Sequence, residues 1–156
     1  MQAMWVRMAA GMLLSVGLAA PSQAQQVRAD TLIKWRQSAY QVMTWSTSRI
    51  RANVEGQFNR DEVIRAAQLL NSLANAGMGT LYPTGTESGS GWHETTVRPE
   101  LFRNQALVAE RAGALARETG AMLNLAASGD VPAIKAQYGR LVQACKNCHE
   151  DLKFRE

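Results

Sequence analysis

Apolar residues recur three and four positions apart along most of the chain, which is the spacing of one face of an α-helix. Polar and charged residues fill the positions between them. No stretch alternates apolar and polar residues with the period of two that a half-buried strand requires. The sequence therefore predicts an all-α protein with four helical segments, at about residues 29–54, 61–76, 99–129 and from 130 onward.

Capping residues mark where these segments begin. Asn59 followed by Glu62 resembles a capping box in front of the second segment. Pro99 suits the first turn of the third segment, and Asp130 is an N-cap for the fourth. Residues 78–97 are rich in Gly, Ser and Thr without periodicity and form a loop. A loop of this length in a compact domain usually serves a function or packs against a ligand.

Short connections between most of the helices favour an antiparallel up-down-up-down four-helix bundle. In the first helix the predicted inward stripe consists of Leu32, Trp35, Ala39, Val42, Met43, Ile50 and Val54. In the fourth it consists of Ile134, Tyr138, Leu141, Val142, Cys145, Cys148, His149 and Leu152. A cofactor bound at the cysteines would thus lie between the fourth helix and the helices that face it.

The end of that stripe contains the motif CKNCH at residues 145–149, a CxxCH, which is the attachment signature of a c-type haem. Two thiols add to the vinyl groups of one porphyrin, and the adjacent histidine reaches the iron from the same side. Residues three and four positions apart share a helical face, so Cys145, Cys148 and His149 project together. The sequence predicts one covalently attached haem c with His149 as axial ligand of the iron.

Other interpretations of a Cys-x-x-Cys pair fit less well. A zinc ribbon needs a second pair of ligands, whereas the rest of the sequence offers only His93 and no further cysteine. A thioredoxin-like redox pair opens a helix within a βαβ unit, and the sequence has no such pattern. Since thioether formation would use both thiols, we expect no disulfide.

The first 24 residues have the pattern of a secretory signal peptide. Arg7 is the only charge before thirteen apolar residues at 8–20, and small residues at 22–24 form the cleavage site. Thirteen apolar residues are too few to span a bilayer, which takes about 20. Cleavage after Ala24 would leave residues 25–156 as one haem domain in the periplasm, with no membrane anchor.

The charge of the chain gives little indication of a macromolecular partner. The sequence has 17 Lys and Arg against 13 Asp and Glu, a net charge of +4, and the basic residues form no block. We therefore expect no nucleic-acid binding and no polybasic membrane contact. A mild positive excess is compatible with weak attraction to a small acidic redox partner protein.

Together the helices and the motif resemble cytochrome c′, a family of c-type haem proteins built as up-down four-helix bundles. The resemblance covers the whole predicted mature chain. Its anchors are WRQSA at residues 35–39, GTE at 85–87, RPEL at 98–101 and CKNCHEDLK at 145–153. A CxxCH near the C-terminus of four helices is the specific element, because the small cytochrome c carries its motif near the N-terminus.

The resemblance implies roles for residues outside the motif. Arg36 and Gln37 would lie near the haem propionates, and Thr86 with Glu87 would lie near the haem edge. Without the resemblance, the sequence is also compatible with Arg36 as a solvated surface charge.

On the two faces of the haem, the resemblance implies a non-coordinating Tyr40 in the distal pocket. Lys153 would lie in the proximal pocket, four residues beyond His149, at a position where the family often has Arg. Without the resemblance, Tyr40 is a core tyrosine and Lys153 a cation near a helix C-terminus.

The resemblance further implies a five-coordinate iron that binds NO and CO, electron transfer as a second activity, and a homodimer through the first two helices. The alternative is a six-coordinate His/Met electron carrier of the c-556 type. Candidates for a sixth ligand are Met43, Met78, Met122 and His93, although methionines at helical spacing are more often core residues. A peroxidase is the third class considered; it needs a distal acid–base histidine, which the sequence does not place, so we expect no enzyme.

Overall fold

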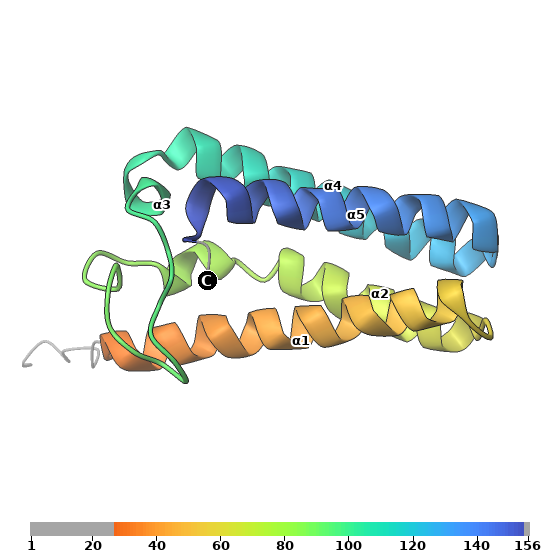
Figure 1. The fold of residues 1–156 in the computed structure, drawn as a ribbon, viewed down its shortest axis with the longest axis horizontal. Coiled ribbons are helices and arrows are strands. Elements are labelled where there is room, and N and C mark those ends of the chain that lie inside the picture. Colours follow the sequence, from red (N-terminus) through yellow and green to blue (C-terminus); the bar gives the residue numbers. More distant parts are fainter. Residues whose placement is uncertain (1–26, 155–156) are drawn as a thin grey trace, which may run out of the picture.

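The computed structural model describes residues 27–154. This part of the chain forms α1 (Ala29–Glu55), α2 (Arg60–Ala74), the 3₁₀ helix η1 (Met78–Leu81), α3 (Glu100–Arg103), α4 (Gln105–Ser128) and α5 (Val131–Leu152). The four long helices run up, down, up and down, with α1 and α2 in one layer and α4 and α5 in the other (Figure 1). The predicted all-α four-helix bundle is confirmed.

Helix α2 begins at the predicted Asn59 cap, but the capping box is only half formed. The Asn59 side chain accepts a hydrogen bond from the backbone N–H of Glu62 at 3.1 Å. The Glu62 carboxylate turns away from the cap and accepts from Arg49 Nε at 3.1 Å. The Asn59 N–H donates instead to Asn53 Oδ1 at 2.7 Å. Side chains of α1 therefore complete the start of α2 and join the two helices.

The predicted third helix over residues 99–129 is divided in two. Helix α3 ends at Arg103, and Asn104 leaves the helical conformation to cap α4, where its side chain accepts from the N–H of Leu107 at 3.1 Å. The prediction of one continuous helix was wrong because an asparagine side chain competes for backbone N–H groups and so favours a new helix start. Helix α5 begins at the predicted Asp130 cap.

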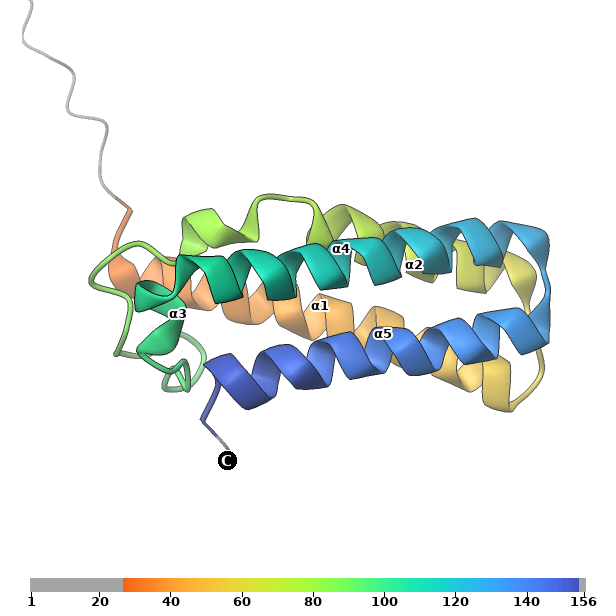
Figure 2. The same cartoon turned by 90° about the horizontal axis from the view of Figure 1, so that it is seen from above.

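The hydrophobic core fills the half of the bundle that contains the α1–α2 and α4–α5 turns (Figure 2). Its buried members come from all four long helices and are Met43, Ile50, Val54, Val63, Ala66, Ala67, Leu70, Met122, Ala126, Ile134 and Leu141. The start of α1, the end of α5 and the long loop lie at the opposite end. Aliphatic packing therefore closes one end of the bundle, and the CxxCH motif lies at the other.

Two residues of the predicted inward stripe of α1 point outward. Trp35 is 51% exposed and Val42 is 37% exposed. The inward face instead includes the polar residues Arg36, Ser46 and Asn53, all at most 4% exposed. The stripe predicted from apolar character was wrong here because α1 buries polar side chains, of which Arg36 and Asn53 find hydrogen-bond partners within the fold.

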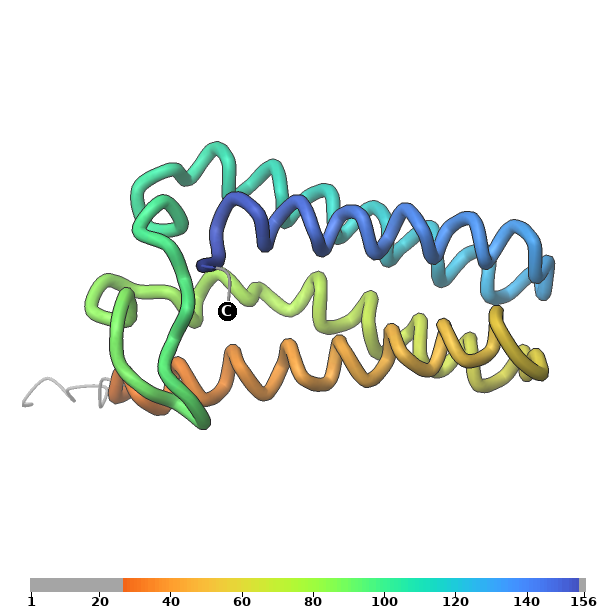
Figure 3. The backbone as a smooth tube through the Cα atoms, in the orientation of Figure 1, coloured from red at the N-terminus to blue at the C-terminus, as the bar shows by residue number. Residues whose placement is uncertain are grey.

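The loop over residues 78–97 crosses from the α1–α2 layer to the α4–α5 layer at the end of the bundle where α1 begins and α5 ends (Figure 3). Gly91 lies against α1, where an added Cβ would come within 2.7 Å of the backbone N of Lys34 and still closer to the Gln37 amide oxygen. Only glycine permits this approach. The loop is therefore docked on the first helix.

No helix within residues 27–154 is both long and apolar enough to span a bilayer. The predicted signal peptide at residues 1–24 lies outside the described residues.

Candidate haem site

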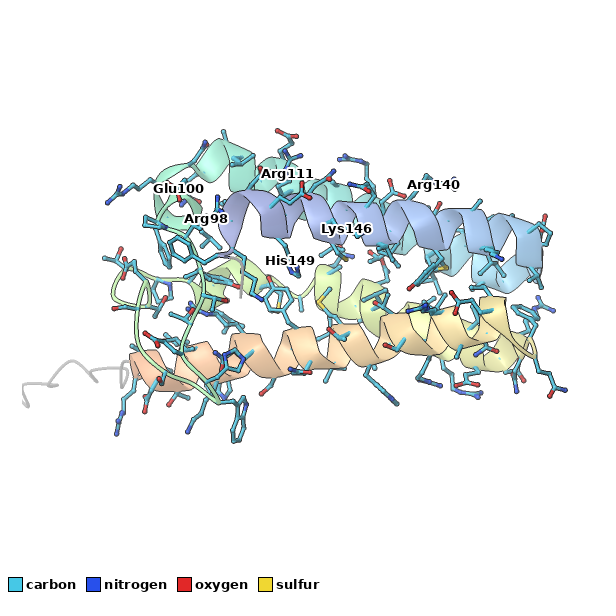
Figure 4. The ribbon with its side chains drawn as sticks, viewed as in Figure 1. Arg98, Glu100, Arg111, Arg140, Lys146 and His149 are labelled. Carbon is cyan, nitrogen blue, oxygen red and sulfur yellow. The ribbon has the colours of Figure 1, made fainter. Side chains whose placement is uncertain are left out.

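The CxxCH motif lies in the last turns of α5. Cys145 and Cys148 are free thiols and both are partly buried. Burial raises the pKa of both thiols, so they stay protonated in the isolated chain. His149 lies on the side of α5 that faces α1 and α2 (Figure 4). Two thiols and one imidazole are thus presented together by one stretch of helix.

The surroundings of His149 favour its neutral form. Burial lowers the pKa of the imidazole, and the positive charge of Lys153 lowers it further. A neutral imidazole has the free nitrogen lone pair that an iron ligand needs. The electrostatics therefore suit axial ligation.

Lys153 follows the last residue of α5, four residues beyond His149. Helix α5 ends at Leu152, and Lys153 adopts an extended conformation with φ −130° and ψ 138°. Its N–H still donates to the His149 carbonyl at 3.1 Å, and the residue pairs with Val97 of the loop. The loop therefore holds the C-terminal end of α5 next to the His149 imidazole.

Arg36 is buried, with 2% of its surface exposed. Its two terminal nitrogens donate to Thr86 Oγ1 at 3.0 Å, to the Thr86 carbonyl at 2.8 Å, to Thr95 Oγ1 at 2.7 Å and to the Leu81 carbonyl at 3.3 Å. A buried guanidinium is stable only when acceptors surround it in this way. Arg36 is therefore not a solvated surface charge, and it ties α1 to Thr86.

Gln37 and Glu87 are also held by the loop. Gln37 accepts from the N–H of Trp92 at 2.7 Å and donates to the carbonyl of His93 at 2.9 Å. The Glu87 carboxylate accepts from the N–H of Gly85 at 2.7 Å. Arg36 and Gln37 of α1 are therefore bonded to the loop, and Glu87 lies next to Thr86 within that loop.

Tyr40 lies one helical turn after Arg36 and is 39% exposed. Burial is the main cause that raises the pKa of its phenol and that of the nearby Tyr82 phenol. Negative charge on Cys145 or Cys148 would raise the pKa of Tyr40 further, which shows that its phenol lies near the motif. Tyr40 thus lies across from the CxxCH of α5.

Tyr82 is the site residue that the sequence analysis missed. The Arg36 guanidinium lies over its ring at 4.4 Å from the ring centre, and Phe102 meets it edge-on at 6.3 Å. The only available signal was an aromatic residue inside a loop of small polar residues. Nothing local indicates that this ring packs against Arg36 of α1.

Three of the four candidates for a sixth ligand have other contacts. Met43 and Met122 are buried in the aliphatic core cluster. The His93 ring contacts the Gln37 amide at 3.3 Å and the Glu94 carbonyl at 2.8 Å through the same nitrogen, Nδ1. Met78 lies in η1.

The donor set fits a porphyrin better than a bare metal ion. In residues 27–154 no three His, Cys, Asp or Glu side chains converge as a metal site. A porphyrin supplies four nitrogen ligands itself, so one imidazole and two thiols are sufficient. Arg98, whose N–H donates to the Leu152 carbonyl at 2.9 Å, also has a buried Nε without a hydrogen-bond partner. A haem carboxylate is an acceptor that would satisfy such a donor.

A four-helix bundle with a CxxCH on its last helix defines the class of c-type haem proteins. Comparison with known proteins gives the family. The family model described as Cytochrome C′ matches residues 31–155. The chain belongs to the cytochrome c′ family, whose members carry covalently attached haem c, and haem, iron and electron transport fit this family.

Individual relatives agree with this assignment. The chain is 44% identical over 133 residues to the cytochrome c′ of Rhodocyclus tenuis, covering 85% of this chain and 100% of that protein. The crystal structure of cytochrome c′ from Thermochromatium tepidum matches with a TM-score of 0.78 at 36% identity, over 83% of this chain and 98% of that one. Another solved cytochrome c′, described by an unusual ligand-controlled dimer dissociation, matches with a TM-score of 0.80 at 35% identity over the same shares.

Proposed function

We propose that this protein is a periplasmic, five-coordinate haem c protein that binds diatomic gases such as NO and CO and transfers electrons as a second activity. The observation that carries the proposal is Tyr40, which faces the CxxCH motif from α1 with a phenol whose pKa is raised by burial. A protonated phenol is a poor iron ligand. It fills space on the distal side without binding the metal.

Different residues of the site would hold different parts of the haem. Cys145 and Cys148 would hold the haem through two thioethers, and His149 would bind its iron. Arg36, Gln37, Thr86 and Glu87 would lie toward the propionates and the haem edge, where bonds to the loop fix Arg36 and Gln37. Lys153 would lie on the proximal side. The bound haem supplies a redox-active iron with a coordination position open to a diatomic ligand.

The two other function classes lack support from the described residues. A His/Met carrier of the c-556 type needs a methionine on α1 in place of Tyr40, and the nearest, Met43, is buried in the core cluster. A peroxidase needs a free distal histidine, and His93 is bound within the α1–loop contact. We therefore propose a binding protein without catalytic activity.

Optical spectra of the ferric and ferrous protein, with and without CO or NO, test the proposal. We expect a high-spin five-coordinate ferrous spectrum that changes to low-spin on addition of CO. A low-spin ferrous spectrum in the absence of gas would contradict the proposal and favour the His/Met electron carrier.

The proposed assembly is a homodimer through α1 and α2. Trp35, Val42 and Trp45 are spaced so that they share one outward face of α1, and they are 51%, 37% and 54% exposed. Large apolar groups gathered on one exposed face are typical of interfaces. A related protein of 35% identity is described by its dimer dissociation.

Trp45→Glu should shift the protein from dimer to monomer, because burying a carboxylate in an apolar interface is costly. Sedimentation velocity of the holoprotein would measure the change. Lys135→Glu is the control, since it adds a carboxylate at an exposed position of α5 rather than on α1. A wild-type monomer, or a Trp45→Glu dimer, would contradict this assembly.

A further inference from the structure

Trp92 of the loop is exposed to solvent and yet held in one position. Of the large apolar side chains in residues 27–154 it is the most exposed, at 70%. Its backbone N–H donates to Gln37 Oε1 at 2.7 Å, and its indole Nε1 donates to Ser38 Oγ at 2.8 Å. The Lys34 ammonium lies 5.4 Å from the ring centre. The ring is therefore a fixed aromatic surface that faces solvent.

These contacts place the indole beside the exposed apolar face of α1. Ser38 comes three residues after Trp35 and four before Val42, so it lies on the same outward face as they and Trp45 do. The loop runs along the start of α1 (Figure 1). By bonding to Ser38, the indole of Trp92 extends this face from the helix onto the loop. The result is one exposed apolar patch built from two distant segments.

The composition of the patch fits a second copy of this chain. Its three tryptophans, Trp35, Trp45 and Trp92, each expose more than half of their surface. Homodimer interfaces are more apolar than transient ones, and aromatic residues are enriched in them, whereas electron-transfer encounters bury little surface. The patch is also continuous with the α1 face of the proposed homodimer. In a twofold dimer the same patch lies on both subunits, so each exposed ring would be buried twice.

We propose that Trp92 is part of the homodimer interface, which therefore extends from the helices onto the loop. The inference rests on the proposed homodimer and adds a segment to it. Because the indole is already fixed by Ser38 and Gln37, it loses little conformational freedom when a partner covers it. The loop that bonds Arg36 and Gln37 thus also contacts the partner subunit.

Hydroxyl-radical footprinting of the holoprotein, read by mass spectrometry, tests this contact without altering Trp92. The wild-type dimer is compared with the Trp45→Glu monomer at the same protein concentration. We expect Trp92 to be oxidised severalfold more slowly in the dimer, because the partner covers its ring. Phe102 of α3, next to the α4–α5 layer, is the internal reference and should react equally in both proteins (Figure 1).

Trp92→Ala tests how much the indole contributes to the dimer. We expect the dimer dissociation constant to rise about ten- to a hundredfold, as is typical when a tryptophan in an interface is truncated. Sedimentation equilibrium of the holoprotein measures this constant. Lys135→Ala is the control, since it removes an exposed side chain of α5, and it should leave the constant unchanged.

The outcomes separate this inference from the proposed assembly. A monomeric wild type, or a Trp45→Glu variant that remains dimeric, would overturn the assembly and the inference together. If the wild type is a dimer and Trp45→Glu a monomer, equal oxidation of Trp92 in both would refute only the role of the loop. An unchanged dissociation constant in Trp92→Ala would refute it as well. A patch kept free for a redox partner would give that second pattern.

Discussion

Replacing Tyr40 with Ala should raise the affinity of the ferrous protein for CO by about ten- to a hundredfold and speed its binding. In the wild type an incoming ligand must displace the phenol ring. Displacement costs packing and rotamer strain on the order of 1–3 kcal/mol, and truncation to Ala removes this cost. Stopped-flow mixing of ferrous protein with CO gives the rate, and titration gives the affinity.

Tyr40→Phe is the matched control for Tyr40→Ala. It keeps the ring and removes only the hydroxyl. We expect a change in rate well below that of Tyr40→Ala, because the ring still fills the same space. If Tyr40→Ala leaves CO binding unchanged, Tyr40 does not occlude the distal side.

Replacing both Cys145 and Cys148 with Ala should make the haem extractable and lower the free energy of unfolding by several kcal/mol. The aliphatic core occupies the opposite half of the bundle, so the haem is the main apolar mass expected at the CxxCH end. A void left by a lost core group destabilises a protein by roughly 2–5 kcal/mol. Thermal melts of wild-type and variant protein would measure this.

Two further measurements complete the test of attachment. The wild type should survive acid–acetone extraction, and its intact mass should equal residues 25–156 plus one haem. Lys146→Ala is the matched control, because Lys146 lies between the cysteines on the same turns of α5 and is exposed (Figure 4). Haem that extracts freely from the wild type, or equal melting midpoints with and without haem, would contradict these expectations.

Local features of the fold followed directly from the sequence. Helix starts at Asn59 and Asp130 depend on side chains that bond N–H groups three residues away. The shared placement of Cys145, Cys148 and His149 depends only on helical spacing. The family resemblance, which rests on these motifs, also pointed to the cytochrome c′ fold before any tertiary contact was known.

The structure differs from the sequence-based predictions in α4 and on α1. Residues 99–129 have helical periodicity throughout, yet Asn104 interrupts them by capping a new helix. On α1, apolar character assigned Trp35 to the interior, whereas the structure buries Arg36 next to it. An arginine can be buried only because acceptors from a distant loop surround it.

The sequence by itself determined the four long helices, the attachment motif and the histidine next to it, because each depends on residues within about one helical turn. The tertiary structure decided which partners complete the distal side. Arg36 and Thr86 are 50 positions apart, and the same loop places Tyr82 against the Arg36 guanidinium and approaches α1 closely at Gly91. Contacts of that separation depend on the path of the loop between the helix layers, which no local pattern encodes.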